Sequence, residues 1–108
     1  MARVQHLIGR HLWVKRDPAW NAVMETIALP LFSDPERDAL LQWIDLERRQ
    51  IDWDAIHRTA EQFSEEQRIL LRIAHALFNE GPCQLWELGR MSSRGRSAAM
   101  MIIGLRYL

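Results

Sequence analysis

The chain has 108 residues, 48% of them hydrophobic, and its fourteen basic residues balance its fourteen acidic ones. This length fits a single domain, residues 1–108, with one buried core, and no apolar run approaches the roughly 18 residues that a membrane span needs. A lone cysteine excludes an internal disulfide and a paired-cysteine zinc site. The basic N-terminal segment lacks the apolar stretch of a secretory signal, so we expect a cytoplasmic protein.

The charge is sorted along the sequence. Residues 1–16 carry four basic residues and no acid, residues 17–66 carry twelve acids and four arginines, and residues 67–108 carry six arginines and two glutamates. The formal charges are therefore +4, −8 and +4. The basic ends either form surfaces that bind a partner or fold onto the acidic middle. We expect the second arrangement, because a neutral chain with so many acids repels DNA as readily as it attracts it.

Apolar residues recur at helical spacing in almost every part of the chain, and no long segment alternates with the period of a strand. The clearest stripe runs from Trp20 to Leu31 and follows Asp17 and Pro18, which are typical of a helix start. Pro30 should end or kink this helix. In the first half, the expected helices cover about Arg3–Val14, the segment from Pro18 to Pro30, Ser33 to about Arg49, and about Asp52 to Phe63.

The second half contains the helix that we expect at the centre of the fold. Ser64 and Gln67 form a capping-box pattern, and the residues that follow are apolar around most of a helix, as in a helix buried inside a bundle. Gly81 is available for a left-handed cap. The expected helices here cover Glu65–Asn79, about Gln84–Arg90 and about Ser97–Tyr107, with a turn at Met91–Gly95. The fold is thus predicted to be all-α, a single compact bundle of five to seven helices around residues 65–79.

Part of the second half resembles a known group of sequences. The residues concerned are Ile51-Asp52-Trp53, Phe63-Ser64, Ile69-Leu70-Leu71-Arg72-Ile73-Ala74 and Leu77-Phe78-Asn79. Over about residues 51–108, the chain resembles small all-helical proteins of unknown function from high-GC actinobacteria or their phages. The resemblance implies an all-helical fold and a bacterial or phage source, and it implies no activity, cofactor or site residue.

The segment at about 84–105 has the outline of a helix-turn-helix, with two short helices joined by a polar turn. A recognition helix needs a polar face that reads base edges, and the apolar run Ala98–Leu105 leaves none. We therefore prefer a hairpin of the core and keep a DNA-binding transcriptional regulator as the alternative function. The candidate nucleic-acid contacts are Arg3, Arg10, Arg90, Arg94 and Arg96.

The last helix leads to the preferred function. Its apolar residues occupy more than one face. One face can pack on Glu65–Asn79, and the rest leaves an apolar patch of a kind that monomers rarely expose. Symmetric dimers are the commonest oligomers. We therefore expect a non-catalytic module for protein interaction or self-association, most simply a homodimer. The candidate contact residues are Trp86, Met100, Met101 and Ile103.

No motif of a known catalytic site is present, so an enzyme ranks third. Asp54, His57 and Glu61 fall on one helix face, but a di-metal bundle needs a second acid-x-x-His unit that the other histidines do not provide. His75 is expected to be a lone core histidine hydrogen-bonded to a backbone carbonyl, and Cys83 a small buried residue. We expect no catalytic residue, no metal and no cofactor.

Overall fold

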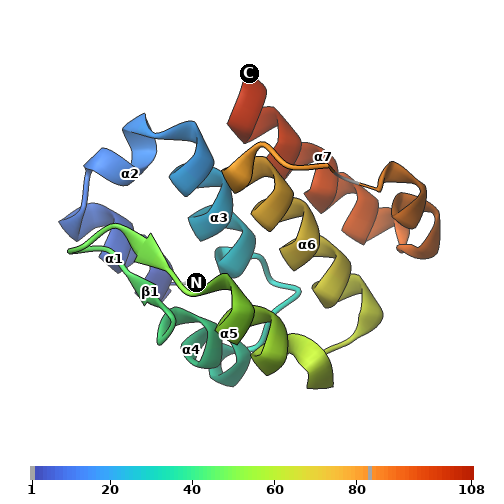
Figure 1. The fold of residues 1–108 in the computed structure, drawn as a ribbon, viewed down its shortest axis with the longest axis horizontal. Coiled ribbons are helices and arrows are strands. Elements are labelled where there is room, and N and C mark those ends of the chain that lie inside the picture. The colour runs from blue at the N-terminus through green and yellow to red at the C-terminus, as the bar shows by residue number, and fades with distance from the viewer. Residues whose placement is uncertain (1, 83) are drawn as a thin grey trace.

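The computed structural model describes residues 2–82 and 84–108, with side chains from Val4 onward within those ranges. In this part of the chain the helices form one all-α bundle with a short antiparallel hairpin, which confirms the predicted fold class (Figure 1). The radius of gyration is 12.8 Å, close to the ~13 Å of a compact domain of this length. The elements are α1 (Ala2–Arg10), α2 (Trp13–Arg16), α3 (Pro18–Ala28), α4 (Asp34–Leu41), β1 (Ile44–Asp45), β2 (Gln50–Ile51), α5 (Trp53–Thr59), η1 (Ala60–Gln62), α6 (Glu65–Asn79), η2 (Leu85–Arg90) and α7 (Ser93–Tyr107), where η denotes a 3₁₀ helix.

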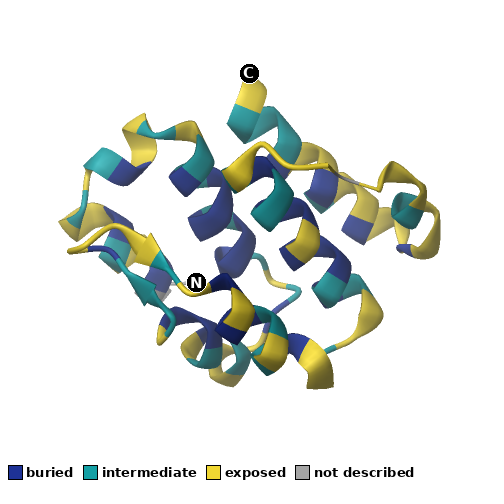
Figure 2. Cartoon of the chain, in the orientation of Figure 1, coloured by how far each residue is buried: buried dark blue, intermediate teal, exposed yellow. Residues whose placement is uncertain are grey.

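Two apolar clusters meet across α3 and α6. The first is formed by residues from the first half of the chain, α1 to α5, together with residues of α6. It includes the fully buried Phe32 and Ile56. The second lies between α3, α6 and α7, and it includes Ile69, Leu70 and Ile102. Because α6 contributes residues to both clusters, it is buried on two sides, as its sequence predicts. Figure 2 shows the same pattern, with buried residues along α3 and the inward faces of α6 and α7.

Side-chain caps start the helices where the sequence predicts them. The Asp17 carboxylate accepts hydrogen bonds from the first amides of α3, and capping boxes at Ser33 and Ser64 open α4 and α6. The end of α3 has a cap that the sequence did not reveal. The buried guanidinium of Arg37 donates to the carbonyl oxygens of Ile27 at 3.0 Å and Leu29 at 2.8 Å, so it satisfies carbonyls that a helix end leaves unpaired.

The first predicted helix is wrong as a single element. It breaks after Arg10 into α1 and α2. Ile8 and Val14 are both fully buried, although six positions put them on different faces of one continuous helix. The break lets both enter the core, and Leu12 is consequently 64% exposed.

The third predicted helix is too long. It ends at Leu41, and residues 44–51 form the β1–β2 hairpin in place of a helix that reaches Arg49. Arg49 takes a left-handed backbone conformation, with φ of 55°, which a helix interior excludes. The hairpin buries Leu46, and the Trp43 indole donates to the Thr59 hydroxyl of α5 at 2.9 Å.

The predicted turn at Met91–Gly95 is also wrong, because α7 begins at Ser93 with Ser92 as its cap. Gly95 is buried inside the helix, where a Cβ would overlap the Glu66 carboxylate of α6. That carboxylate accepts from the amide and the hydroxyl of Ser92, so it ties α6 to the start of α7. At the end of α6 the left-handed residue is Glu80, with φ of 53°, and not Gly81.

Candidate functional site

The predicted nucleic-acid contacts do not gather on one face. Arg10 is exposed at the end of α1, whereas Arg90, Arg94 and Arg96 are exposed at η2 and the start of α7. These elements lie at opposite ends of the long axis (Figure 1). The side chain of Arg3 lies outside the described side chains. Arg90 stacks over the Trp86 ring at 4.6 Å, and Arg96 donates to the Met91 carbonyl at 2.8 Å.

Some of the charged side chains pair with one another within the chain. His11 lies 3.7 Å from Glu47 and so connects the N-terminal basic segment with the acidic middle. Two other ion pairs, Arg72–Glu87 at 3.0 Å and Arg106–Glu80 at 2.9 Å, lie within the last third of the chain. Arg106 also donates to the Leu77 carbonyl near the end of α6, where a cation is favoured by the helix dipole.

The predicted self-association residues divide between surface and core. Trp86 is 60% exposed, Met100 59% and Met101 44%, whereas Ile103 is half-buried and packs against the second apolar cluster. Along α7 the outward positions include Arg94, Ser97, Met100, Met101, Gly104 and Tyr107, which we call the outer α7 stripe. Their spacing of three and four residues keeps them on one side of the helix. The middle of the stripe, at Met100 and Met101, is apolar in a position where a helix of a monomer usually carries polar residues.

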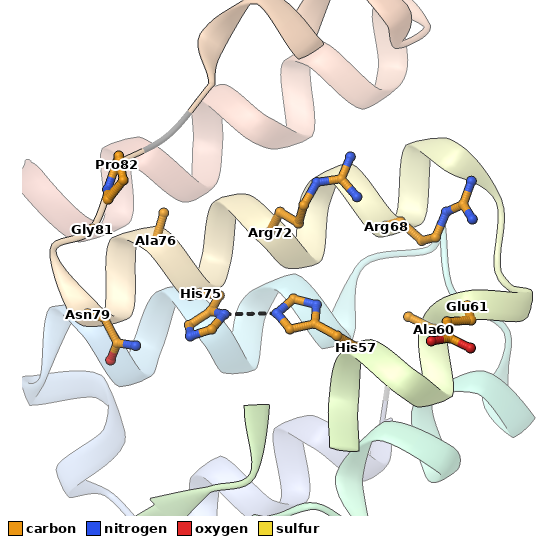
Figure 3. A pocket seen from close by; sticks show the side chains of 10 residues that line it. All are labelled: His57, Ala60, Glu61, Arg68, Arg72, His75, Ala76, Asn79, Gly81 and Pro82. Carbon is orange, nitrogen blue, oxygen red and sulfur yellow. Dashed lines mark hydrogen bonds between the residues drawn. The ribbon is translucent and has the colours of Figure 1, made fainter. Parts of the chain in front are cut away.

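A pocket of about 590 Å³ opens between α5, η1 and α6, and the sequence did not predict it. Figure 3 shows its side chains: His57 comes from α5, Glu61 from η1, and Arg68, Arg72 and His75 from one side of α6. Its volume falls within the range of small-molecule sites. The two arginines and His75 stand at positions three and four apart, so they lie along one side of α6. The Arg72 guanidinium points away from the histidines and toward Glu87 of η2 (Figure 3).

Two histidines are paired in this pocket. His57 Nε2 and His75 Nδ1 lie 2.8 Å apart, at hydrogen-bond distance. The ring of Trp53 stacks on His75 with centroids 4.3 Å apart and an angle of 5°, and it holds the imidazole from the core side. The sequence placed His57 and His75 in separate motifs, and the hydrogen bond arises only because α5 packs on α6. The expectation of a lone core histidine bonded to a backbone carbonyl is therefore wrong: His75 is half-buried, lines the pocket, and is paired with a second imidazole.

The pair favours neutral imidazole. Burial lowers the pKa of His57 below its ordinary value, and His75 and Arg72 lower it further, while Asp54 opposes the shift. Burial also lowers the pKa of His75, against an opposing effect of Asp54. Both rings are therefore held uncharged at neutral pH, when one of the inner nitrogens can donate and the other accept.

The charged groups around the pair are unevenly matched. Arg72 donates to the Glu87 carboxylate through Nη2 at 3.0 Å. Arg68 is half-buried, and among the described residues its side chain makes no hydrogen bond and no ion pair. The side chain of Glu61 on the other wall is likewise unpaired within that set. A guanidinium in a partly apolar pocket without a carboxylate partner is a group that an anion would satisfy.

A metal centre is not assembled. Within residues 2–82 and 84–108, no three histidine, cysteine, aspartate or glutamate side chains come together in a set that would hold a metal ion. The predicted face of Asp54, His57 and Glu61 thus stays a set of separate groups, and Cys83 lies outside the described residues.

No helix in the described part of the chain has both the length and the apolar character needed to cross a bilayer. The chain matches no known protein family, no curated protein and no solved structure. Its function is therefore argued from its own geometry.

Proposed function

We propose that this protein is a non-catalytic self-association module that forms a homodimer through the outer α7 stripe. The observation that supports this proposal is the exposure of Met100 and Met101 on the outward face of a helix whose inward face is already buried through Ala99 and Ile102. Exposed methionines of this kind are enriched at protein interfaces. A second copy of the chain is the occupant that the stripe fits best.

The stripe is complementary to itself in the antiparallel orientation. A two-fold axis between Met100 and Met101 would bring the methionines of the two copies together. Ser97 would then face Gly104 of the partner copy, and the two small residues would let the helices approach closely. Arg94 would face Tyr107 of the partner copy, an exposed ring that can accept a guanidinium on its face. The antiparallel arrangement also opposes the two helix dipoles favourably.

Gly104 supports this orientation. A glycine in the interior of a helix costs about 1 kcal/mol relative to alanine, so it normally has a packing reason. In the single chain no such reason is found among the described residues, because a Cβ at this position would meet only a methyl group of Leu108 at an ordinary 3.7 Å. Close approach of a second helix would supply the reason.

Sedimentation velocity across the micromolar range tests the proposal. The parent should shift from the 12.7 kDa monomer to a dimer as concentration rises. Met100→Glu together with Met101→Glu should remove the shift, because four carboxylates would be buried together at the axis. Gly104→Leu should weaken the dimer by blocking close approach. Leu12→Glu is the matched control, since Leu12 is equally exposed but lies between α1 and α2.

A parent that stays monomeric throughout this range would refute the homodimer. A dimer that survives Met100→Glu with Met101→Glu but is lost in Leu12→Glu would move the interface to the other end of the molecule. Circular dichroism of each variant shows whether its fold is intact, so that loss of association is separated from unfolding.

DNA binding is the competing proposal, and its contacts would be Arg90, Arg94 and Arg96. The outward face of α7 beyond its first turn carries methionines and not base-reading side chains, which argues for a protein partner instead. A titration with duplex DNA at about 50 and about 200 mM salt decides between them, because multi-phosphate contacts lose most of their affinity over that range. Tight, salt-sensitive binding that Arg94→Ala with Arg96→Ala abolishes would replace the self-association proposal.

A further inference from the structure

We propose that the pocket between α5 and α6 binds a small organic acid, with its carboxylate on Arg68 and Arg72 and its binding coupled to uptake of one proton by the His57–His75 pair. This site is independent of the outer α7 stripe, which lies on a different helix. The juxtaposition that carries the inference is an unpaired guanidinium, a second guanidinium and a neutral imidazole pair around one cavity of about 590 Å³.

The arginines provide the charge. Arg68 and Arg72 are one helical turn apart on α6 and both line the pocket. The side chain of Arg68 has no hydrogen bond or ion pair within the described residues, and Arg72 shares its guanidinium with Glu87 across the adjoining surface. A guanidinium offers parallel N–H groups that match the two oxygens of a carboxylate. Arg68 is therefore the main anchor, and Arg72 adds a second positive charge.

The cavity favours an organic acid over a bare inorganic ion. Ala60, Ala76 and Pro82 line the rest of the pocket and offer apolar surface. A ligand with a carboxylate at one end and a ring or short hydrocarbon body at the other satisfies both kinds of wall. Glu61 stands on the wall formed by η1, and its carboxylate disfavours a second negative charge on the ligand at that end.

The histidine pair supplies the coupled proton. In the neutral pair one inner nitrogen donates to the other, so the outer nitrogens, His57 Nδ1 and His75 Nε2, offer one donor and one acceptor. A proton taken from solvent onto the bare outer nitrogen makes that ring an imidazolium and preserves the inner hydrogen bond. A second proton would have to occupy the inner acceptor nitrogen and would break it. The pair therefore gains one proton, and a nearby anion favours that gain.

Calorimetric titration of the full chain with benzoate tests the site. Benzoate stays ionised between about pH 6 and pH 8, so any proton exchange belongs to the protein. We expect binding that weakens about tenfold or more in Arg68→Gln, because charge-assisted hydrogen bonds are lost. Arg58→Gln is the matched control: it removes an exposed arginine of α5 that does not line the pocket, and it should bind as the parent does. Benzyl alcohol, the neutral analogue, should bind far more weakly.

The proton coupling is measured in the same experiment. In two buffers with different ionisation enthalpies, the parent should take up a proton on binding benzoate, and its affinity should rise from pH 8 to pH 6. His57→Gln with His75→Gln should lose this dependence and keep part of the affinity through Arg68, because neither imidazole then remains to take up the proton. The groups that face the pair from the packed elements are Asp54, Arg72 and Trp53, and they are unchanged in this variant.

Several results would overturn the proposal. Equal affinity in Arg68→Gln and Arg58→Gln would remove the anchor, equal affinity for benzyl alcohol would leave only an apolar cavity, and binding with no proton uptake would remove the role of the histidine pair. Micromolar zinc binding that His57→Gln abolishes, without any benzoate binding, would assign the pair to a metal. Because none of these variants touches α7, the dimer test can fail while this site stands, and the reverse is also true.

Discussion

The helices α6 and α7 are each fifteen residues long and both pack on α3, but they turn opposite kinds of surface outward. The outward face of α6 carries Arg68, Arg72 and His75, the polar kind of residue that the outer face of an amphipathic helix usually carries. The outward face of α7 carries Met100 and Met101. The inward faces are alike, since both are buried and apolar. Stability of the single chain therefore accounts for the inward face of α7, and the outward face is the one for which we propose association.

The same contrast separates the two proposed activities. The polar face of α6 borders a cavity, where separate charged groups can meet a small ligand. The outward face of α7 has exposed methionines at its middle, which another protein surface could cover. Changes on the inner faces should therefore alter stability, and changes on the outer faces should alter binding.

The largest expected effect comes from the inner faces. Ile73→Ala on α6 and Ile102→Ala on α7 should each reduce the free energy of unfolding by about 2–5 kcal/mol, because both side chains are buried and leave cavities. Leu71→Ala, on the other side of α6, should cost as much. Urea denaturation at a concentration where the chain is monomeric measures this.

Met100→Ala is the matched outer-face change. It should alter the monomer's free energy of unfolding by less than about 0.5 kcal/mol, and a large loss would mean that the outer α7 stripe is covered within one chain. Near-neutral effects of Leu71→Ala and Ile73→Ala would show that α6 is not the centre of the fold.

Short-range signals made most of the fold predictable. Asp17, Ser33 and Ser64 fixed the starts of α3, α4 and α6, because a cap depends only on neighbouring residues. The errors arose where distant contacts outweigh local preference. Leu46 enters the core through the hairpin. Gly95 lies inside α7, and the Glu66 carboxylate of another helix occupies the space that a Cβ at this position would fill.

The candidate sites follow the same division. Met100 and Met101 could be proposed as surface residues because the run Ala98–Leu105 is apolar on every side. The pairing of His57 with His75 could not be predicted, since it depends on how α5 docks on α6. The spacing of Arg68, Arg72 and His75 along α6 was the feature of the sequence that could have indicated the pocket. Its meaning depends on the histidine of α5, which the sequence does not place nearby.

A smaller effect distinguishes the two glycines of α7. Gly104→Ala should raise the free energy of unfolding of the monomer by up to about 1 kcal/mol, because helix propensity improves and a Cβ there meets no close atom. Gly95→Ala should give no such gain, because its Cβ would displace the Glu66 carboxylate from the Ser92 amide and hydroxyl. Thermal unfolding of both variants measures the difference.

The background variant Glu66→Ala is the control for this pair. With the carboxylate removed, Gly95→Ala should become stabilising, as Gly104→Ala is in the parent. If Gly95→Ala already stabilises the parent, the contact between Glu66 and the start of α7 does not constrain that position.

The smallest expected effect is the pH dependence of the α6 face. Burial lowers the pKa of both His57 and His75 below their ordinary value of 6.5, so near and below pH 6.5 the unfolded chain binds protons more readily than the folded one. The pair's contribution to stability is therefore full above pH 6.5, declines as the pH falls through 6.5 toward the folded pKa values, and is lost below them. The half-exposed rings keep the change modest, because solvent screens their charges.

Urea denaturation of the parent at intervals from about pH 7 to pH 5 should show this decline, and His57→Gln with His75→Gln should flatten it. His6→Gln, which removes an exposed histidine of α1, should keep the parent's decline. The lowered pKa of Glu36 acts at a more acidic pH, below its ordinary value of 4.5, so it does not obscure this window. A parent that grows more stable as the pH falls from 7 to 5 would mean that the pair is held charged in the folded chain, and the proton would then be present before any organic acid binds.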